Sequence, residues 1–151
     1  IKVARIFNTY GPRMSVNDGR VVSNFVCQAL QNKEITIYGD GKQTRSFCYV
    51  DDLIEGIIKF SLKDRSFSGP INLGNPHEMR IIDIANTIVD LTNSKSIISF
   101  HPLPSDDPVK RNPDISVANK TLEWNPKIEF KEGIIKTIEF FEKALSDSNV
   151  K

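Results

Sequence analysis

Arginines recur in predicted loops or at the ends of predicted elements: Arg13, Arg20, Arg45 and Arg111. An arginine carries a permanent charge on a planar fork that binds two oxygens at once, which suits a phosphate or a carboxylate. Each charge-assisted contact contributes about 1.5–3 kcal/mol. Several such arginines in one cleft would form a diphosphate site, whereas any one of them alone is better explained as a surface residue or as the partner of a nearby acid such as Asp18.

Tyr38 heads the turn sequence YGDG, where its flat ring could flank a base, although a single aromatic residue in a turn more often packs against the core. Tyr38 and Lys42 have the Tyr-x-x-x-Lys spacing used on helices for hydride transfer. Two glycines and an aspartate separate them, which predicts a turn, so we interpret the spacing as coincidence. His77 and His101 are isolated from each other and from the cysteines, so no metal site is predicted.

Short strands and helices alternate along the chain. The segment 44–50 is predicted to form a hairpin with 35–38 across an Asp-Gly turn. Asp51 or Asp52 could cap the helix that follows, the helix from residue 81 lacks a capping Ser or Thr, and Trp124 is expected to pack against the final helix. Strands are predicted at 1–7, 35–38, 44–50, 71–74 and 97–103, and helices at 20–31, from 51 or 52, at 81–91, 114–122 and 130–145.

These elements predict an α/β or α+β domain, with too few and too brief strands for a full doubly wound sheet. We assign residues 1–145 to this unit and 146–151 to a flexible tail. The 151 residues carry 20 Lys and Arg against 19 Asp and Glu, which disfavours nucleic acid or an acidic membrane as a partner. The two cysteines, Cys27 and Cys48, make no disulfide framework, which favours a reducing compartment, and the sequence has no apolar run long enough for a bilayer. The chain opens with Ile1 inside an apolar strand, which predicts a fragment.

Five motifs occur in an order that resembles the C-terminal half of extended short-chain dehydrogenases that modify nucleotide sugars. They are ARIFNTYGPRM, DGRVVSNF, TIYGDGKQTRSFCYVDDL, INLGNP and DDPVKRNPDI, and they span nearly the whole chain. The closely spaced GPRM and DGR, with DDPVKRNPDI later, are most similar to the UDP-glucuronic acid decarboxylase family. The resemblance implies that the first strand is the last strand of the Rossmann half, and that most of the Rossmann sheet is missing.

The resemblance also implies roles for individual residues. Arg13 would lie by the sugar as the catalytic arginine that holds the carboxylate or assists proton transfer. The backbone from Phe7 to Tyr10 would lie near the nicotinamide end of NAD. The residues implied to bind the nucleotide sugar are Asn8, Arg20, Asn24, Tyr38 near the base, Arg45 on the diphosphate, and Arg111 at the diphosphate and ribose.

In that family NAD oxidises C4 of UDP-glucuronate, the resulting β-keto acid loses its carboxylate, and hydride returns to C4 to give UDP-xylose. The NAD loop and the catalytic Tyr-x-x-x-Lys helix would precede Ile1, as would the helices of the usual homodimer. We therefore expect this chain to lack activity alone. A 4,6-dehydratase, a 4-epimerase and a non-catalytic nucleotide-sugar-binding module are the alternatives. Location in the cytoplasm is expected, or in the Golgi if a membrane anchor lies upstream.

Overall fold

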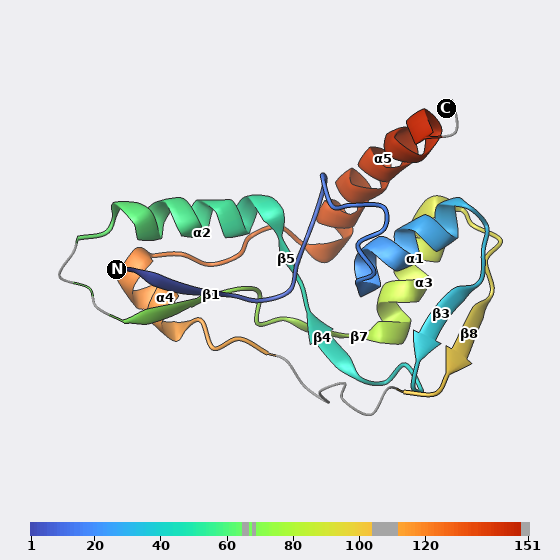
Figure 1. The fold of residues 1–151 in the computed structure, drawn as a ribbon. Coiled ribbons are helices and arrows are strands. Elements are labelled where there is room, and N and C mark those ends of the chain that lie inside the picture. Colours follow the sequence, from blue (N-terminus) through green and yellow to red (C-terminus); the bar gives the residue numbers. More distant parts are fainter. Residues whose placement is uncertain (65–66, 68, 104–111, 149–151) are drawn as a thin grey trace.

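The computed structural model describes residues 1–64, 67, 69–103 and 112–148. Figure 1 shows an elongated arrangement in which β4, β5 and β7 join two groups of elements. In chain order the elements are β1 (Val3–Ile6), β2 (Thr9–Tyr10), α1 (Val21–Leu30), β3 (Ile35–Tyr38), β4 (Thr44–Ser46), β5 (Cys48–Tyr49), α2 (Val50–Leu62), β6 (Pro70–Leu73), β7 (Glu78–Arg80), α3 (Ile81–Thr92), β8 (Ile98–His101), α4 (Ser116–Leu122) and α5 (Phe130–Ser148).

The strands pair two by two among the described residues. β1 lies parallel to β6, β2 to β5 and β3 to β8, whereas β4 and β7 are antiparallel. The predicted α/β class is therefore confirmed. In the described ranges β1 has β6 as its one neighbouring strand, and Val3 and Ile6 remain 50% and 56% exposed. This matches the expectation for β1 as a strand whose sheet is largely absent from the chain.

The predicted hairpin is wrong. The segment 44–50 divides into β4, β5 and the start of α2, and β4 pairs with β7 instead of returning beside β3. The intervening turn forms as expected, since Gly39 and Gly41 have φ values of +82° and +73° and the Asp40 carboxylate accepts a hydrogen bond from the Lys42 N–H. The turn chemistry was thus correct, but it does not determine which strand the chain joins afterwards.

The same turn explains how α3 begins without a side-chain cap. The N–H groups of Ile81 and Ile82 donate to the main-chain oxygens of Gln43 and Gly41, at 3.1 and 3.0 Å. These bonds satisfy amides at the start of α3 that otherwise lack intrahelical partners. Backbone oxygens of the turn therefore take the place of the missing Ser or Thr side chain.

Two hydrophobic clusters match the two groups of elements in Figure 1. One contains Val26 of α1, Ile84 of α3 and Phe141 of α5. The other lies between α2, α4 and β6 and contains Trp124. The expectation that Trp124 packs against the final helix is wrong, because Trp124 packs against α2 instead. Its indole lies so close to Gly56 of α2 that a Cβ at that position would be only 2.9 Å away.

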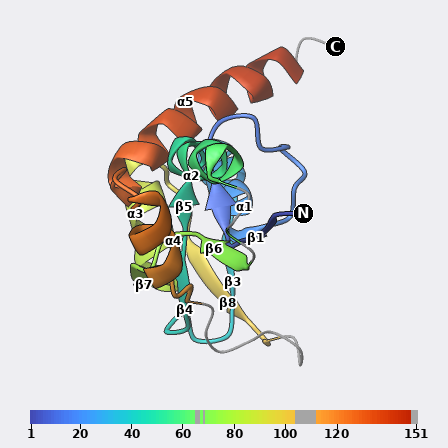
Figure 2. The ribbon, with the colours of Figure 1, turned by 90° about the vertical axis from the view of Figure 1, so that its left-hand side faces the viewer.

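The long helix α5 crosses over one end of the strands, as the turned view in Figure 2 shows. Its Gly133 allows close approach, because a Cβ at this position would clash with the Tyr10 hydroxyl and with the Tyr49 ring. The helix continues through Ser148, three residues beyond the boundary predicted for the tail. This close contact attaches α5 to the β2–β5 strand pair.

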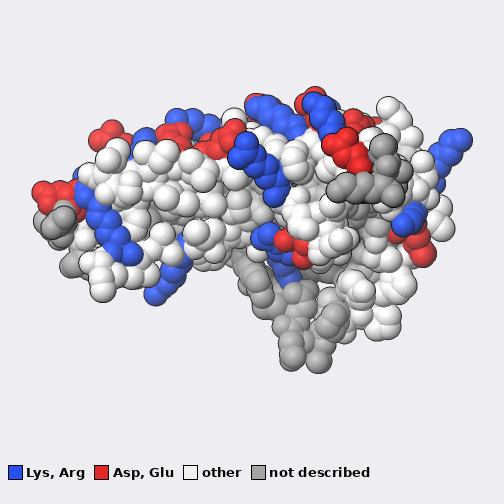
Figure 3. Space-filling model, turned by 45° about the horizontal axis from the view of Figure 1, so that its top comes forward, with Lys and Arg blue, Asp and Glu red and all other residues white. Residues whose placement is uncertain are grey.

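The surface carries charges of both signs. On the face shown in Figure 3, Lys and Arg side chains alternate with Asp and Glu side chains over the helices. This intermixing agrees with the near balance of acidic and basic residues in the composition. Within the described ranges, no helix has the length and apolar character needed to cross a bilayer.

Candidate functional site

The extended segment around Asn8 connects the two groups of elements. The N–H of Phe7 donates to the Leu73 main-chain oxygen at 3.0 Å, and the N–H of Cys48 donates to the Asn8 main-chain oxygen at 2.9 Å. These bonds hold the backbone around Asn8 against β6 and against the connecting strand β5. Asn8 therefore lies in a short connection between β1 and β2 whose backbone is fixed by hydrogen bonds.

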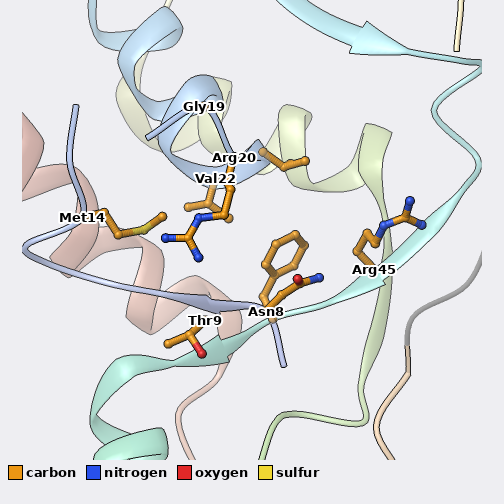
Figure 4. Close-up of a pocket in the computed structure, with 9 residues that line it drawn as sticks. Asn8, Thr9, Met14, Gly19, Arg20, Val22 and Arg45 are labelled. Atoms are coloured by element: carbon orange, nitrogen blue, oxygen red, sulfur yellow. The ribbon is translucent and has the colours of Figure 1, made fainter. Parts of the chain in front are cut away.

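A cavity of about 260 Å³ lies between this strand and the beginning of α1. Figure 4 shows its side chains, which come from the N-terminal strand and loop, from α1 and from β4. The predicted residues Asn8, Arg20 and Arg45 thus lie around one space. The lining consists of Asn8, Thr9, Met14, Gly19, Arg20, Val21, Val22, Arg45 and Phe47.

The N-terminus of α1 gives this cavity a site suited to an anion. Helix α1 begins after Arg20 with no side-chain cap and no acidic residue in its first turn. Its first N–H groups have no partner within the helix, and the helix dipole places partial positive charge there. Val21 and Val22, whose N–H groups are among these, line the cavity. Phosphate oxygens are the usual ligands of such helix ends.

Arg20 lines the cavity while paired with Asp18. Its Nε and Nη2 donate to the two oxygens of the Asp18 carboxylate at 2.5 and 2.9 Å. The guanidinium holds the pKa of the Asp18 carboxyl below its usual range, and the hydrogen bond to Asp18 raises the pKa of Arg20. Both groups are therefore charged at neutral pH.

Arg45 contributes the second cation from β4. Its side chain is 7% exposed, and its Nη1 donates to the Thr44 main-chain oxygen at 2.8 Å. A permanently charged guanidinium at a cavity wall attracts an anionic ligand. Arg45 and Arg20 line the same cavity from different elements, β4 and the start of α1, and their guanidinium groups extend to different sides in Figure 4.

A second hollow of about 150 Å³ extends from the first toward β3. The two share Gly19, Val21 and Arg45, so they form one groove along α1. Here Asn24 donates its Nδ2 to the Gly19 main-chain oxygen at 3.0 Å. The predicted Asn24 and Tyr38 belong to this second hollow, whose remaining lining is Phe25, Thr36, Ile37, Gln43 and Ile81.

Tyr38 is a surface residue at the end of this groove. Its side chain is 52% exposed and its ring lies 5.9 Å from the ring of His101, centroid to centroid. The main-chain oxygen of Tyr38 accepts a hydrogen bond from Gln43 Nε2 at 2.5 Å. The turn is thus fixed while the ring remains open to solvent.

Arg13 lies outside the main cavity. It lines a separate hollow of about 440 Å³ with Tyr10, Asp18 and Arg20. Its backbone has φ +69°, an uncommon value for a residue with a side chain. Residues with such backbone angles cluster at functional sites.

The two residues predicted near the cofactor, Phe7 and Tyr10, line different hollows. Phe7 lines a hollow of about 420 Å³ with Asn8 and Arg20, next to the main cavity. The side chain of Tyr10 is instead 1% exposed and donates its hydroxyl to the Phe130 main-chain oxygen at 3.2 Å. Burial raises the pKa of Tyr10. Arg111 lies outside the described residues.

Sequence reasoning missed Thr9, Met14 and Phe47 as lining residues, and it named Asp18 only as a possible partner of an arginine, which the structure confirms for Arg20. The DGR sequence contained a signal for Asp18, because a carboxylate two residues before an arginine can fold back onto it across a glycine. Thr9, Met14 and Phe47 carried no such signal, since their place at the cavity depends on strand pairing. Within the described part of the chain, no cluster of His, Cys, Asp or Glu is suited to a metal ion.

Comparisons with known proteins show which proteins this chain resembles. The pattern of the NAD dependent epimerase/dehydratase family matches residues 1–74. UDP-glucuronic acid decarboxylase 1 of Arabidopsis thaliana is 48% identical over 145 residues, which are 96% of this chain and 33% of that protein. UDP-glucuronic acid decarboxylase 1 of Danio rerio is 50% identical over 145 residues, 96% of this chain and 34% of that protein. The chain spans about a third of the length of these relatives.

Solved structures share the fold. A UDP-glucose 4-epimerase from Thermotoga maritima, solved with UDP-glucose, has a TM-score of 0.89 and 28% identity over 95% of this chain and 46% of its own. A UDP-glucuronic acid 4-epimerase from Bacillus cereus, solved with UDP-glucuronic acid and NAD, has a TM-score of 0.88 and 27% identity over 95% of this chain and 45% of its own.

These matches show that residues 1–74 resemble the NAD dependent epimerase/dehydratase class of proteins, and that the chain is similar in fold to UDP-sugar 4-epimerases. Inside that class its sequence is similar to the UDP-glucuronic acid decarboxylases over nearly all of its length. The resemblance predicted from the five motifs is therefore confirmed.

Proposed function

We propose that this chain forms the nucleotide-sugar wall of an NAD-dependent UDP-glucuronate decarboxylase, which converts UDP-glucuronate to UDP-xylose. The observation that carries the proposal is the groove along α1, where Arg20, Arg45 and the uncapped helix N-terminus line one cavity. An anionic diphosphate fits this set of donors. The higher identity to decarboxylases than to the epimerase structures supports decarboxylation over 4-epimerisation.

Different parts of the groove would hold different parts of the nucleotide sugar. The N-terminus of α1 and Arg45 would hold the diphosphate, and the second hollow, with Asn24 and Tyr38, would hold the base. Asn8 and Arg20, at the junction of the main cavity with the Phe7 hollow, would face the sugar. Arg13, near Arg20 in the adjoining hollow, would hold the C5 carboxylate or assist proton transfer.

NAD, when bound, supplies reversible hydride exchange at C4 of the sugar. The extended segment from Phe7 to Thr9 lines the hollow beside the sugar position and is compatible with a neighbouring nicotinamide. A G-x-G-x-x-G loop is absent from the sequence, so most of the NAD contacts would come from segments outside this chain. The chain by itself would therefore bind nucleotide sugar without turnover, and a homodimer would be a property of a longer polypeptide.

Decarboxylation requires the sugar carboxylate to be held until the bond that joins it to the ring breaks. The electrons of that bond then move toward the neighbouring carbonyl. A guanidinium beside that carboxylate assists best if its interaction changes as CO2 leaves. Arg13 and Arg20 supply such groups, while substrates of the 4-epimerases of uncharged hexoses have no carboxylate to hold. This difference gives the arginines a role specific to a uronic acid.

The test is a proton NMR time course with UDP-glucuronate and NAD. It compares this chain with a polypeptide that continues upstream through a glycine-rich loop and a Tyr-x-x-x-Lys helix. UDP-xylose should appear with the longer polypeptide and not with this chain, and Arg13→Ala should slow its formation. UDP-galacturonate as the product would favour the 4-epimerase, and unchanged turnover with Arg13→Ala would remove the proposed role of that arginine.

A further inference from the structure

Asp18 binds Arg20 along one particular edge of the guanidinium. The bonds run from Nε and Nη2 of Arg20 to the two carboxylate oxygens of Asp18, which is a side-on pair. A guanidinium has five N–H donors, and a side-on pair uses one on Nε and one on Nη2. The remaining N–H groups form a second fork at the end of the side chain. Arg20 can therefore bind Asp18 and another pair of oxygens simultaneously.

That free end of Arg20 points into the cavity. Figure 4 shows the guanidinium reaching from the start of α1 into the space between Met14 and Asn8. Arg20 also lines the hollows of Phe7 and of Arg13, so its end lies where three spaces meet. Neutralisation by Asp18 thus leaves the donors that face a ligand available.

Asp18 is itself held in place. Its side chain is 19% exposed, against 60% for that of Arg20. The Ser23 hydroxyl, in the first turn of α1, lies 3.4 Å from Asp18 Oδ2 and also donates to the Arg20 main-chain oxygen at 2.9 Å. Gly19 between the two charged residues has φ +80°, which permits the tight turn. The Asp18–Arg20 pair is therefore held against the first turn of α1.

Resting on the function proposed above, we propose that Asp18 is a positioning residue that orients Arg20 for the anionic groups of the nucleotide sugar. A positioning role and a purely electrostatic role predict opposite effects of removing the charge. If Asp18 only placed negative charge near the site, its removal would strengthen anion binding. If it orients Arg20, its removal releases a long side chain whose rotamer freedom must be lost again on binding.

The chain contains a matched control. Arg80 Nε and Nη2 donate to the two oxygens of Asp83 at 2.7 and 2.8 Å, with the same side-on geometry. This second pair is outside the lining of the groove. The variants Asp18→Asn and Asp83→Asn make the same change of charge, and only the first is expected to alter ligand binding.

The experiment is calorimetric titration of the wild-type chain and both variants with UDP, UDP-glucose and UDP-glucuronate. We expect Asp18→Asn to weaken binding about 5- to 10-fold, because the fork is no longer held, and Asp83→Asn to leave it within about 2-fold. An equal loss for all three ligands would identify phosphate as the group that Arg20 binds. A loss confined to UDP-glucuronate would identify the carboxylate. Either pattern supports the proposal.

A ligand-free readout accompanies the titration. The Nε–H resonance of Arg20 should exchange slowly with water in the wild-type chain and rapidly in Asp18→Asn, while the unfolding midpoint of the variant shows that it is folded. Unchanged or tighter binding by a folded Asp18→Asn would overturn the positioning role alone. Failure of the wild-type chain to bind any of the three ligands would overturn the proposed function as well, so the two failures are distinguishable.

Discussion

The indole Nε1 of Trp124 donates to the main-chain oxygen of Asp52 at 2.9 Å. The carboxylate of the same Asp52 accepts hydrogen bonds from the N–H groups of Lys127 and Ile128, at 3.0 and 2.9 Å. One residue in the first turn of α2 thus fixes the connection between α4 and α5. Asp52, considered from the sequence as a cap for its own helix, instead organises a segment more than seventy residues further along the chain.

Asp52→Ala should destabilise the chain by about 1–3 kcal/mol, since the two part-buried N–H groups of Lys127 and Ile128 lose a charged acceptor. Asp52 is 3% exposed, whereas Asp51 on the same turn is exposed and makes a matched control as Asp51→Ala. Urea unfolding followed by circular dichroism measures both. Equal and small losses for the two variants would show that the Asp52 contacts carry little of the stability.

Gly133→Ala should also destabilise the chain, although alanine is the better helix former by about 1 kcal/mol. The new methyl group would overlap the Tyr10 hydroxyl and the Tyr49 ring, and overpacking costs about 1–3 kcal/mol. Thermal unfolding should show a lower midpoint for this variant than for Glu139→Ala on the exposed side of α5. A rise in the midpoint would mean that α5 is not attached at this position.

The two cysteines should differ in reactivity. Cys48 is fully buried, and burial raises the pKa of its thiol to about 12, so almost no thiolate exists at about pH 8. Burial also raises the pKa of Cys27, which is only half-buried. A disulfide reagent at this pH should modify Cys27 slowly and Cys48 only after denaturant is added. Prompt reaction of both thiols in the native chain would contradict the packing of β5.

Arg45→Lys should weaken UDP binding about 10-fold, because lysine keeps the charge but loses the planar fork. Arg80→Lys is the control, since Arg80 is exposed and lies outside the groove lining. Calorimetric titration with UDP measures the effect. Equal affinities for the wild-type chain and Arg45→Lys would show that the position supplies only charge.

The sequence predicted the helices better than the strand partners. Helix α1 begins and ends within one residue of the predicted 20–31, because its apolar spacing is a local property of the chain. The pairing of β3 with β8, across sixty residues, is not local, and the Asp-Gly turn favoured the wrong partner. Trp124 was misplaced for the same reason, since its contacts with α2 depend on how the two groups of elements are joined.

In the candidate site, too, the sequence predicted residue types better than it predicted contacts between distant segments. Asn8, Arg20 and Arg45 could be selected from residue type and from the order of the motifs, and the fold brings all three to one cavity. The motif order could not show that Asp18 occupies one edge of Arg20, or that Arg13 faces a neighbouring hollow. Those facts depend on the turn at Gly19 and on the backbone of Arg13, which only coordinates describe.

The most direct test of the central claim is titration of the chain with UDP, followed by backbone amide resonances. The account predicts saturable shifts concentrated at residues 19–22, 24, 36–38 and 45, which line the groove along α1. The absence of any saturable change at millimolar UDP, or changes confined to the hollow formed by His77 and Lys127 on another part of the surface, would contradict it.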